Sequence, residues 1–258
     1  RQFKNTSSDP HSISHNFIQK ILCDDEGRMW FGTEGGGLNL FDATTQRFVR
    51  YMHNPRDSNS LSHNVVRPVY QDKQGTLWIG TDGSGLNMYD KKTDSFVHLL
   101  HEVLTQSSLA SDRIVTIYED PAGTLWFGTW GKGVDRYSPS KQKFKQTETM
   151  NIVMSKLPTK FIISLFEDSH GRLWFGTHGA GVLMFEPQTK TTELFTHEPL
   201  NEHSLSNNTA WSVREDGNGV LWFATDDGVS SYNPDTKRFE RFGFNPSSDN
   251  SLGSKFSG

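Results

Sequence analysis

The sequence predicts an all-β fold assembled from five copies of one repeat. Five tryptophans lie 48 residues apart, at Trp30, Trp78, Trp126, Trp174 and Trp222. Six residues before each tryptophan is an aspartate, at Asp24, Asp72, Asp120, Asp168 and Asp216. Three residues after each aspartate is a glycine, at Gly27, Gly75, Gly123, Gly171 and Gly219. A fixed period of this length is the signature of a repeat architecture, so one unit determines the fold of the whole chain.

Each repeat contains a tight β-hairpin around the aspartate and the glycine. Aspartate accepts hydrogen bonds from the amides of its own turn, and glycine adopts positive φ because it has no Cβ. In the second repeat we expect strands at 65–72, 76–82, 85–90 and 95–101, from their alternation and their β-branched and aromatic content. The turns between these strands fall at 73–75, 83–84 and 91–94. A four-stranded antiparallel meander therefore fills each unit.

Stacking of these meanders predicts a β-propeller. A lone four-stranded sheet leaves both faces uncovered, and copies arranged radially around an axis cover one another. A β-solenoid is the alternative, but its turns are shorter than 48 residues. The blade cores are expected at 13–53, 61–101, 109–147, 157–197 and 205–243, within a single domain of residues 1–258.

Two sets of aromatic residues are expected to fill the space between neighbouring blades. One set closes the third strand of each repeat: Phe41, Tyr89, Tyr137, Phe185 and Tyr232. The other is assigned to the fourth strand: Phe48, Phe96, Phe144, Phe195 and Phe239.

The ends of the chain predict that the five complete blades belong to a larger ring. Residues 1–4 resemble the fourth strand at 46–50, and residues 245–258 repeat the segment 54–66. Partial blades therefore flank the five complete ones, and we expect a ring of seven in the parent protein. By itself the chain can form an open arc whose edge strands pair with other chains, a smaller closed ring, or a homodimer.

The composition excludes several classes of partner. The formal net charge is −4, from 26 basic and 30 acidic residues, which gives no basic field for phosphates, so no nucleic acid is expected as a partner. Cys23 is the only cysteine, so no intrachain disulfide can form. No apolar run reaches about 18 residues and no signal peptide is recognised, so we expect no membrane contact within this chain. We also expect no cofactor.

The repeated motif resembles that of a known family. It reads DKQGTLWIGTDGSGL at 72–86 and DSHGRLWFGTHGAGV at 168–182, and this pattern is similar to the two-component regulator propeller repeat. The resemblance covers essentially the whole chain. It implies a large periplasmic sensor region that precedes a transmembrane helix and a cytoplasmic output, such as a histidine kinase or a diguanylate cyclase. The chain would then be the extracytoplasmic, ligand-sensing input of a signalling receptor.

The candidate ligand-binding residues lie in loops at one end of the predicted blades. Directly after each WFGT-type segment, one position changes its chemistry while its flanks stay fixed: Glu34, Asp82, Trp130, His178 and Asp226. Arg67 and Trp211 share one register of the first strand and are further candidates. Propellers bind ligands at one mouth of the central channel, where these loops emerge. Surface loops also vary without any function, so a structural role for these positions stays open.

Two further sets of residues are expected near the same opening. Polar residues in the loops between blades, among them Asn64, Asp112 and Asn208, are expected close to the mouth. A column of mostly small polar residues in the first strands is expected to face the channel water: Lys20, Pro68, Thr116, Ser164 and Ser212.

A small molecule or an oligosaccharide is the ligand that these residues favour. Sugars stack their apolar faces on aromatic rings and hydrogen-bond to planar polar groups, which Trp130, Trp211 and the nearby Asp, Asn and His side chains offer. Glu34, Asp82, His178 and Asp226 could instead hold a metal ion, but no local spacing such as HExxH occurs, so no metal is predicted. The turn aspartates and the WFGT tryptophans are interpreted as structural.

Three classes of function stay open: a sensory binding domain, an enzyme, and a passive protein-interaction scaffold. The glycine-rich stretches at 32–39 and 128–135 lie in hairpins rather than at helix starts, so they do not form phosphate-binding loops. The LWF segment also resembles the streptogramin-lyase propellers, which use a histidine and a magnesium site. The residues needed for that chemistry cannot be matched here. We therefore predict a sensor domain without catalytic residues.

Overall fold

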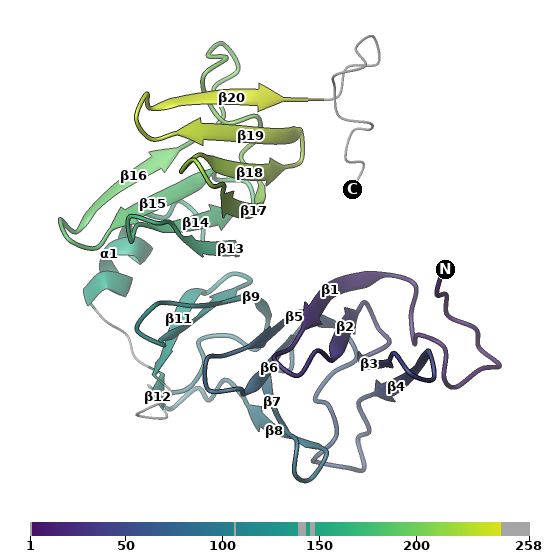
Figure 1. The fold of residues 1–258 in the computed structure, drawn as a ribbon. Coiled ribbons are helices and arrows are strands. Elements are labelled where there is room, and N and C mark those ends of the chain that lie inside the picture. Colours follow the sequence, from purple (N-terminus) through teal and green to yellow (C-terminus); the bar gives the residue numbers. More distant parts are fainter. Residues whose placement is uncertain (1, 106, 139–142, 145–147, 244–258) are drawn as a thin grey trace. The chain divides into compact units, whose positions relative to one another are not determined.

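Each 48-residue repeat folds into a four-stranded antiparallel sheet, or blade, through which the chain meanders from the first strand to the fourth (Figure 1). The computed structural model of the chain describes residues 2–105, 107–138, 143–144 and 148–243. The predicted all-β fold of four-stranded blades is confirmed. The segment 244–258, part of the predicted partial blade at the C-terminal end, lies outside the described residues.

The strands of the blades have the following bounds. Blade 1 contains β1 (Ile18–Cys23), β2 (Met29–Thr33), β3 (Leu38–Asp42) and β4 (Arg47–Tyr51). Blade 2 contains β5 (Val66–Gln71), β6 (Leu77–Thr81), β7 (Leu86–Asp90) and β8 (Ser95–Leu99). Blade 3 contains β9 (Ile114–Glu119), β10 (Leu125–Thr129), β11 (Gly133–Ser138) and β12 (Lys143–Phe144). Blade 4 contains β13 (Ile162–Glu167), β14 (Leu173–Thr177), β15 (Val182–Glu186) and β16 (Thr191–Phe195). Blade 5 contains β17 (Ala210–Glu215), β18 (Leu221–Thr225), β19 (Gly228–Asn233) and β20 (Arg238–Phe242).

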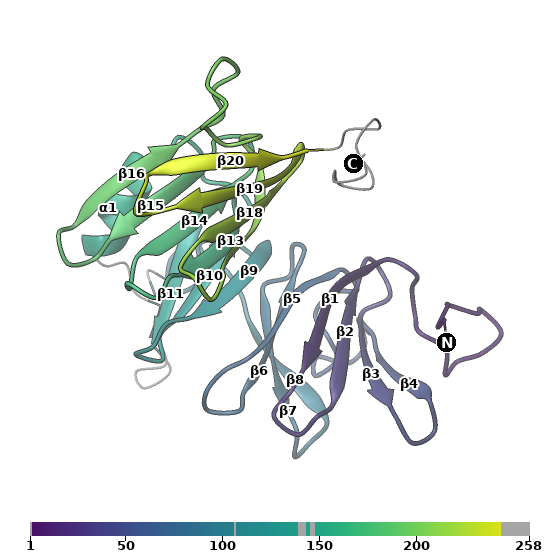
Figure 2. The same cartoon turned by 45° about the horizontal axis from the view of Figure 1, so that its top comes forward.

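The chain divides into two compact units. Unit one comprises Arg1–Thr129 and Asp135–Lys145, and unit two comprises Trp130–Val134 and Gln146–Gly258. Within unit one, β5 contacts β1 on one side and β9 on the other, and within unit two β13 contacts β17. Figure 2 shows blades 1 and 2 of unit one as the successive meanders β1–β4 and β5–β8. The first strands of consecutive blades therefore lie next to one another within each unit.

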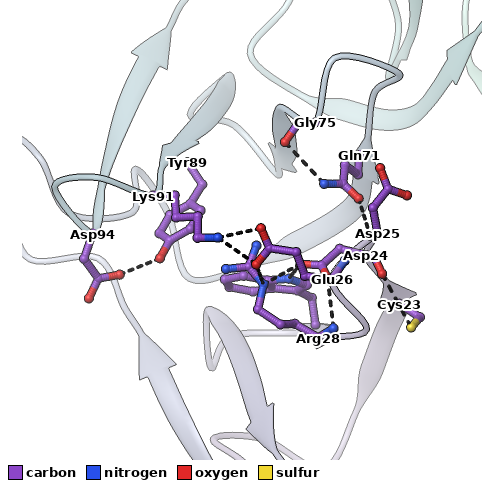
Figure 3. Close-up of polar contacts among 11 residues, drawn as sticks. Cys23, Asp24, Asp25, Glu26, Arg28, Gln71, Gly75, Tyr89, Lys91 and Asp94 are labelled. Carbon is purple, nitrogen blue, oxygen red and sulfur yellow. Dashed lines mark hydrogen bonds and ion pairs between the residues drawn. The ribbon is translucent and has the colours of Figure 1, made fainter.

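The aspartate of each hairpin turn hydrogen-bonds both to its turn and to the repeat tryptophan. Asp24 Oδ1 accepts the N–H groups of Glu26 and Arg28 at 3.1 and 2.8 Å, and its Oδ2 accepts the indole N–H of Trp30 at 2.8 Å (Figure 3). The same indole-to-carboxylate bond recurs in the other four blades at 2.8, 3.0, 2.8 and 2.9 Å. Gly27 ends the first of these turns with φ of +76°. One side chain therefore closes the hairpin and fixes the ring that fills the blade interface.

Hydrogen bonding also keeps the buried turn carboxylate ionised. Burial would raise the pKa of Asp24, but hydrogen bonds from the Trp30 indole and from Arg28 outweigh it and hold the pKa below its usual value. The Arg28 guanidinium reaches the same carboxylate at 2.7 Å. Figure 3 shows a second tie at this end of the blades, in which Lys91 of the β7–β8 turn pairs with Glu26 of the β1–β2 turn at 2.5 Å.

The repeat tryptophans lie between blades, as predicted. Trp30, Trp78, Trp126 and Trp174 are 0–5% exposed, and Trp222 of the last described blade is 36% exposed. Each of three tryptophans packs on the third-strand tyrosine of the following blade, with ring centroids 5.3 Å apart for Trp30 and Tyr89, 5.4 Å for Trp78 and Tyr137, and 5.9 Å for Trp174 and Tyr232. An aromatic residue in such a position buries a large apolar area, so these contacts provide much of the interface stability.

One assignment in the fourth-strand aromatic set was wrong. Phe185 pairs with Thr192, as Phe41 pairs with Phe48, so Thr192 occupies the register given to Phe195. Phe195 pairs with Val182 and corresponds to Tyr51, which pairs with Leu38. Since residues three apart on a strand point to opposite faces, Phe195 faces the following blade and not the preceding one.

The connection between blades 3 and 4 differs from the other described connections. Helix α1 (Glu148–Lys156) precedes blade 4. Met154 of this helix lies so close to Gly133 that a Cβ there would meet the Met154 Cε at 2.0 Å. Within the described residues, no helix has the length and apolar character needed to cross a membrane.

Candidate functional site

The variable positions after the WFGT segments lie at one end of the blades, where second strands meet the starts of first strands. Isolated β-bridges join Glu34 to Val65, Asp82 to Arg113 and Trp130 to Phe161. The backbone N–H of His178 donates to the Phe161 carbonyl at 3.0 Å. This end is opposite to the aspartate turns within each hairpin. We call it the variable end and define it by three columns of residues with 48-residue spacing.

The first column is Glu34, Asp82, Trp130, His178 and Asp226. The second, in the first strands, is Gln19, Arg67, Val115, Ile163 and Trp211. The third, at the starts of the first strands, is Phe17, Val65, Arg113, Phe161 and Thr209. Five of the seven predicted site residues belong to the first column and two to the second.

In unit one, the variable end holds a cluster of one carboxylate and two arginines. Asp82 accepts hydrogen bonds from Arg67 Nη2 at 2.9 Å and from Arg113 Nε at 2.6 Å. The hydrogen bond from Arg113 lowers the pKa of Asp82, and Arg67 adds to the effect against the opposing influence of burial. The side chains of Arg67 and Arg113 are 32% and 49% exposed, so the guanidinium groups are open to an incoming ligand.

Glu34, the remaining predicted site residue of unit one, is paired with Gln19. The Gln19 amide donates a short hydrogen bond to the Glu34 carboxylate. This contact joins the first and second columns of blade 1, just as the bond between Arg67 and Asp82 does in blade 2.

In unit two, the variable end holds a continuous row of aromatic rings. The ring centroids of Phe161 and Trp130 lie 5.1 Å apart, those of Trp130 and His178 lie 5.2 Å apart, and those of His178 and Trp211 lie 6.0 Å apart. The Trp211 indole N–H donates to Asp226 Oδ1 at 2.6 Å. We call these five residues the aromatic row. Phe161 is 37% and Trp211 is 44% exposed, so the row presents apolar ring surface together with a carboxylate.

The structure thus brings four of the predicted site residues together in unit two and two in unit one. Arg113 and Phe161 are essential members of these clusters, although the sequence interpretation treated the first as one of several loop residues and omitted the second. The 48-residue spacing that links them to Phe17, Val65 and Thr209 would have revealed the third column.

Two expectations about nearby polar residues were wrong in part. Ser164 is buried, and its hydroxyl donates to the Ala210 carbonyl of the next blade at 3.0 Å, while Pro68 packs against Gly80. These members of the polar column therefore face neighbouring backbone and not an open channel. Asn64 and Asn208 accept the N–H groups of His53 and His197 at 2.7 Å, so they brace the loops between blades.

The described residues contain no group of three or more His, Cys, Asp or Glu side chains that could hold a metal ion. Of the four side chains that had been weighed as metal ligands, Asp82 contacts two arginines and Asp226 contacts an indole. Binding by aromatic surface and hydrogen bonds is therefore the chemistry that this end offers.

A family comparison matches the repeats directly. The model of the two component regulator propeller matches residues 12–35, 60–83, 108–131, 156–179 and 204–227. The chain belongs to this repeat family. Each matched segment begins in the loop before a first strand and ends just after the variable position of the first column. The family motif therefore spans the aspartate turn, the tryptophan and the variable end of every blade.

Solved structures of similar fold include extracellular domains of signalling proteins. One is that of BT3049 from B. thetaiotaomicron, described as a hybrid two component system, with a TM-score of 0.76, 26% identity, and coverage of 87% of this chain and 29% of that chain. Another is that of BT4673 from the same organism, described as a one component system, with a TM-score of 0.72, 27% identity, and coverage of 89% and 31%. This chain thus spans about a third of those structures. The comparison with curated proteins gives no match.

More distant structures share the fold alone. XC5397 from Xanthomonas campestris, described as a gluconolactonase, has a TM-score of 0.57 at 12% identity, with coverage of 92% of this chain and 86% of that chain. At this identity the likeness indicates a common blade architecture and carries no reaction with it.

Proposed function

We propose that the chain is the ligand-binding part of a periplasmic sensor region in a signal-transduction receptor, and that it acts by binding and not by catalysis. The observation that carries this proposal is the pairing of a repeat-determined scaffold with a variable end that gathers exposed aromatic and charged side chains. The likeness to extracellular domains of two component and one component systems supports the signalling context. In this proposal the five blades form part of a ring of seven.

The aromatic row supports an oligosaccharide or a similar small molecule as the ligand. Trp211 and Phe161 expose ring faces that can stack on the apolar face of a sugar, and Asp226 can accept hydrogen bonds from its hydroxyl groups. The rings hold one another at fixed centroid distances of 5.1–6.0 Å, so little conformational entropy is lost when a ligand binds.

Isothermal titration calorimetry with a panel of neutral and acidic oligosaccharides tests this proposal. We expect saturable heat with at least one member and at least tenfold weaker binding in Trp211→Ala, because truncating an aromatic anchor commonly costs about 2 kcal/mol. Phe242→Ala is the matched control, since Phe242 is 39% exposed on the outer strand β20, far along the blade from the first strand. A panel without heat, or equal losses in both variants, would refute the assignment of the aromatic row.

The same protein preparation discriminates the other two classes of function. An enzyme related to the lyase propellers would turn over a substrate in a metal-dependent reaction that chelation abolishes. A passive scaffold would bind a protein partner and show neither turnover nor saccharide binding. Melting curves with and without the saccharide panel separate these outcomes, because a ligand that binds the native state raises the melting temperature.

A further inference from the structure

The blade interfaces contain an equivalent position near the outer strands, which an aromatic ring fills in two cases. Between blades 1 and 2 this ring is Tyr51, whose centroid lies 5.9 Å from those of Trp30 and Tyr89 and 5.6 Å from that of Phe96. A repeat tryptophan, a third-strand tyrosine and a fourth-strand phenylalanine thus surround a ring at the end of β4.

Blades 4 and 5 repeat this arrangement. The Phe195 centroid lies 5.6 Å from that of Trp174, 5.0 Å from that of Tyr232 and 5.5 Å from that of Phe239. Tyr51 pairs with Leu38 and Phe195 pairs with Val182, so the two rings occupy the same register of the blade.

Between blades 2 and 3 the same register carries Leu99, which pairs with Leu86. The three residues that would surround a ring are all present as Trp78, Tyr137 and Phe144, and the Trp78 and Tyr137 rings are in contact. In place of the missing ring is a cavity of about 490 Å³, lined by these three residues, Leu99, Glu102 and Thr105. A leucine side chain is too small and too round to cover two aromatic faces, so the space stays open.

We propose that this cavity is a second binding site, which takes a small molecule with a single aromatic ring. The ring would lie where Tyr51 and Phe195 lie in the other two interfaces, against Trp78, Tyr137 and Phe144. A polar substituent would point to the rim, where Thr105 donates to the Glu102 carboxylate at 2.7 Å. The volume falls within the range of about 300–1,000 Å³ that is usual for small-molecule sites. This site is separate from the variable end and does not depend on the function proposed for it.

The probe for this site is 4-methylphenol, which reproduces the side chain of tyrosine. The chain is labelled with 5-fluorotryptophan, and the fluorine NMR signals of its seven tryptophans are assigned with single Trp→Phe variants. A titration to about 20 mM covers the affinity near 1 mM that a ligand of this size commonly reaches. We expect the Trp78 signal to move in a saturable way.

Two substitutions make the test specific. Leu99→Tyr supplies the missing ring, so binding should weaken at least tenfold and the melting temperature should rise, as expected for a filled cavity. Val49→Tyr adds the same side chain at an exposed position of β4 and should leave the binding unchanged. Tyr51→Leu opens the equivalent space in blade 1 and should make the Trp30 signal respond as well.

Several results would overturn the proposal. A Trp78 signal that stays unchanged in the wild-type chain would exclude the site, and so would equal binding in wild type and Leu99→Tyr. A fall in melting temperature in both Leu99→Tyr and the smaller Leu99→Phe, relative to Val49→Tyr, would mean that the interface has no room for a ring. Movement of only the Trp130 or Trp211 signals would place 4-methylphenol at the variable end instead.

Discussion

A buried carboxylate in blade 3 predicts a specific dependence of stability on pH. Asn87 of blade 2 accepts the N–H of Ser62 at 2.9 Å through its Oδ1 and donates to the Ser62 hydroxyl at 2.7 Å through its Nδ2. Asp135 occupies the same position in blade 3 and accepts the N–H of Ala110 at 2.9 Å. Ala110 has no hydroxyl, so the second carboxylate oxygen lacks the partner that this position has in blade 2.

Burial raises the pKa of Asp135 to about 6 from an ordinary value of 3.8, against the opposing effects of the Ala110 N–H and of nearby His101. The unfolded chain therefore releases this proton near pH 4, while the folded chain keeps it until about pH 6. Stability falls as the pH rises through this window, and the full loss is present above it. A difference of this size corresponds to roughly 2–3 kcal/mol at neutral pH.

Asp135→Asn removes the titrating group and should stabilise the protein above pH 6. We expect a gain of about 2 kcal/mol at pH 7.5, which shifts the melting temperature by roughly 4–8 °C for a chain of this size, and no gain at pH 4. Ala110→Ser combined with Asp135→Asn restores the hydroxyl partner and should add to the gain. The converse variant Asn87→Asp should lose stability with rising pH over a similar window.

The assay is a series of melting curves from pH 4 to pH 8 for the wild type and these variants. A stability difference between Asp135→Asn and wild type that stays constant across this range would contradict the reasoning, because a constant difference cannot arise from the titration of Asp135.

Three further predictions concern the scaffold and the variable end. Asp72→Ala leaves a buried indole N–H without its acceptor and should cost on the order of 2–4 kcal/mol in urea denaturation, whereas Asp216→Ala should cost less because its tryptophan is 36% exposed; equal losses would contradict the role of the indole bond. Gly181→Ala should lower the melting temperature more than Gly179→Ala, since both have φ near +85° but an added Cβ meets backbone oxygen at 2.1 Å only at Gly181; equal shifts would leave φ strain as the sole cause. Asp82→Ala should change stability by no more than about 1 kcal/mol, with the difference shrinking in 1 M salt, and a large salt-independent loss would mean that the arginine cluster is structural.

The repeat pattern predicted the scaffold because its main devices are local. Aspartate and glycine at fixed spacing determine a hairpin turn, and the alternation around each tryptophan determines which face is buried. The indole-to-carboxylate bond was not predicted, although the constant six-residue spacing of Asp24 and Trp30 contained it. The register of Phe195 was assigned by residue type alone, and strand pairing shows that counting positions from Phe185 would have placed it correctly.

The candidate site was harder to predict because its members come from different strands. The first column was recognised from its variability, but the contacts of Asp82 with Arg113 and of Trp130 with Phe161 depend on how each second strand bridges to the following first strand. The cavity beside Leu99 has the same character. Only the comparison of three blade interfaces reveals that a ring is missing there.

The account divides the seven tryptophans into five that hold blades together and two, Trp130 and Trp211, that face a ligand. Fluorine NMR of the 5-fluorotryptophan-labelled chain during titration with the oligosaccharide panel tests this division directly. The account predicts that a binding saccharide moves the Trp130 and Trp211 signals and leaves the other five in place. Saturable movement of the Trp30 or Trp174 signal, with Trp130 and Trp211 unchanged, would contradict it.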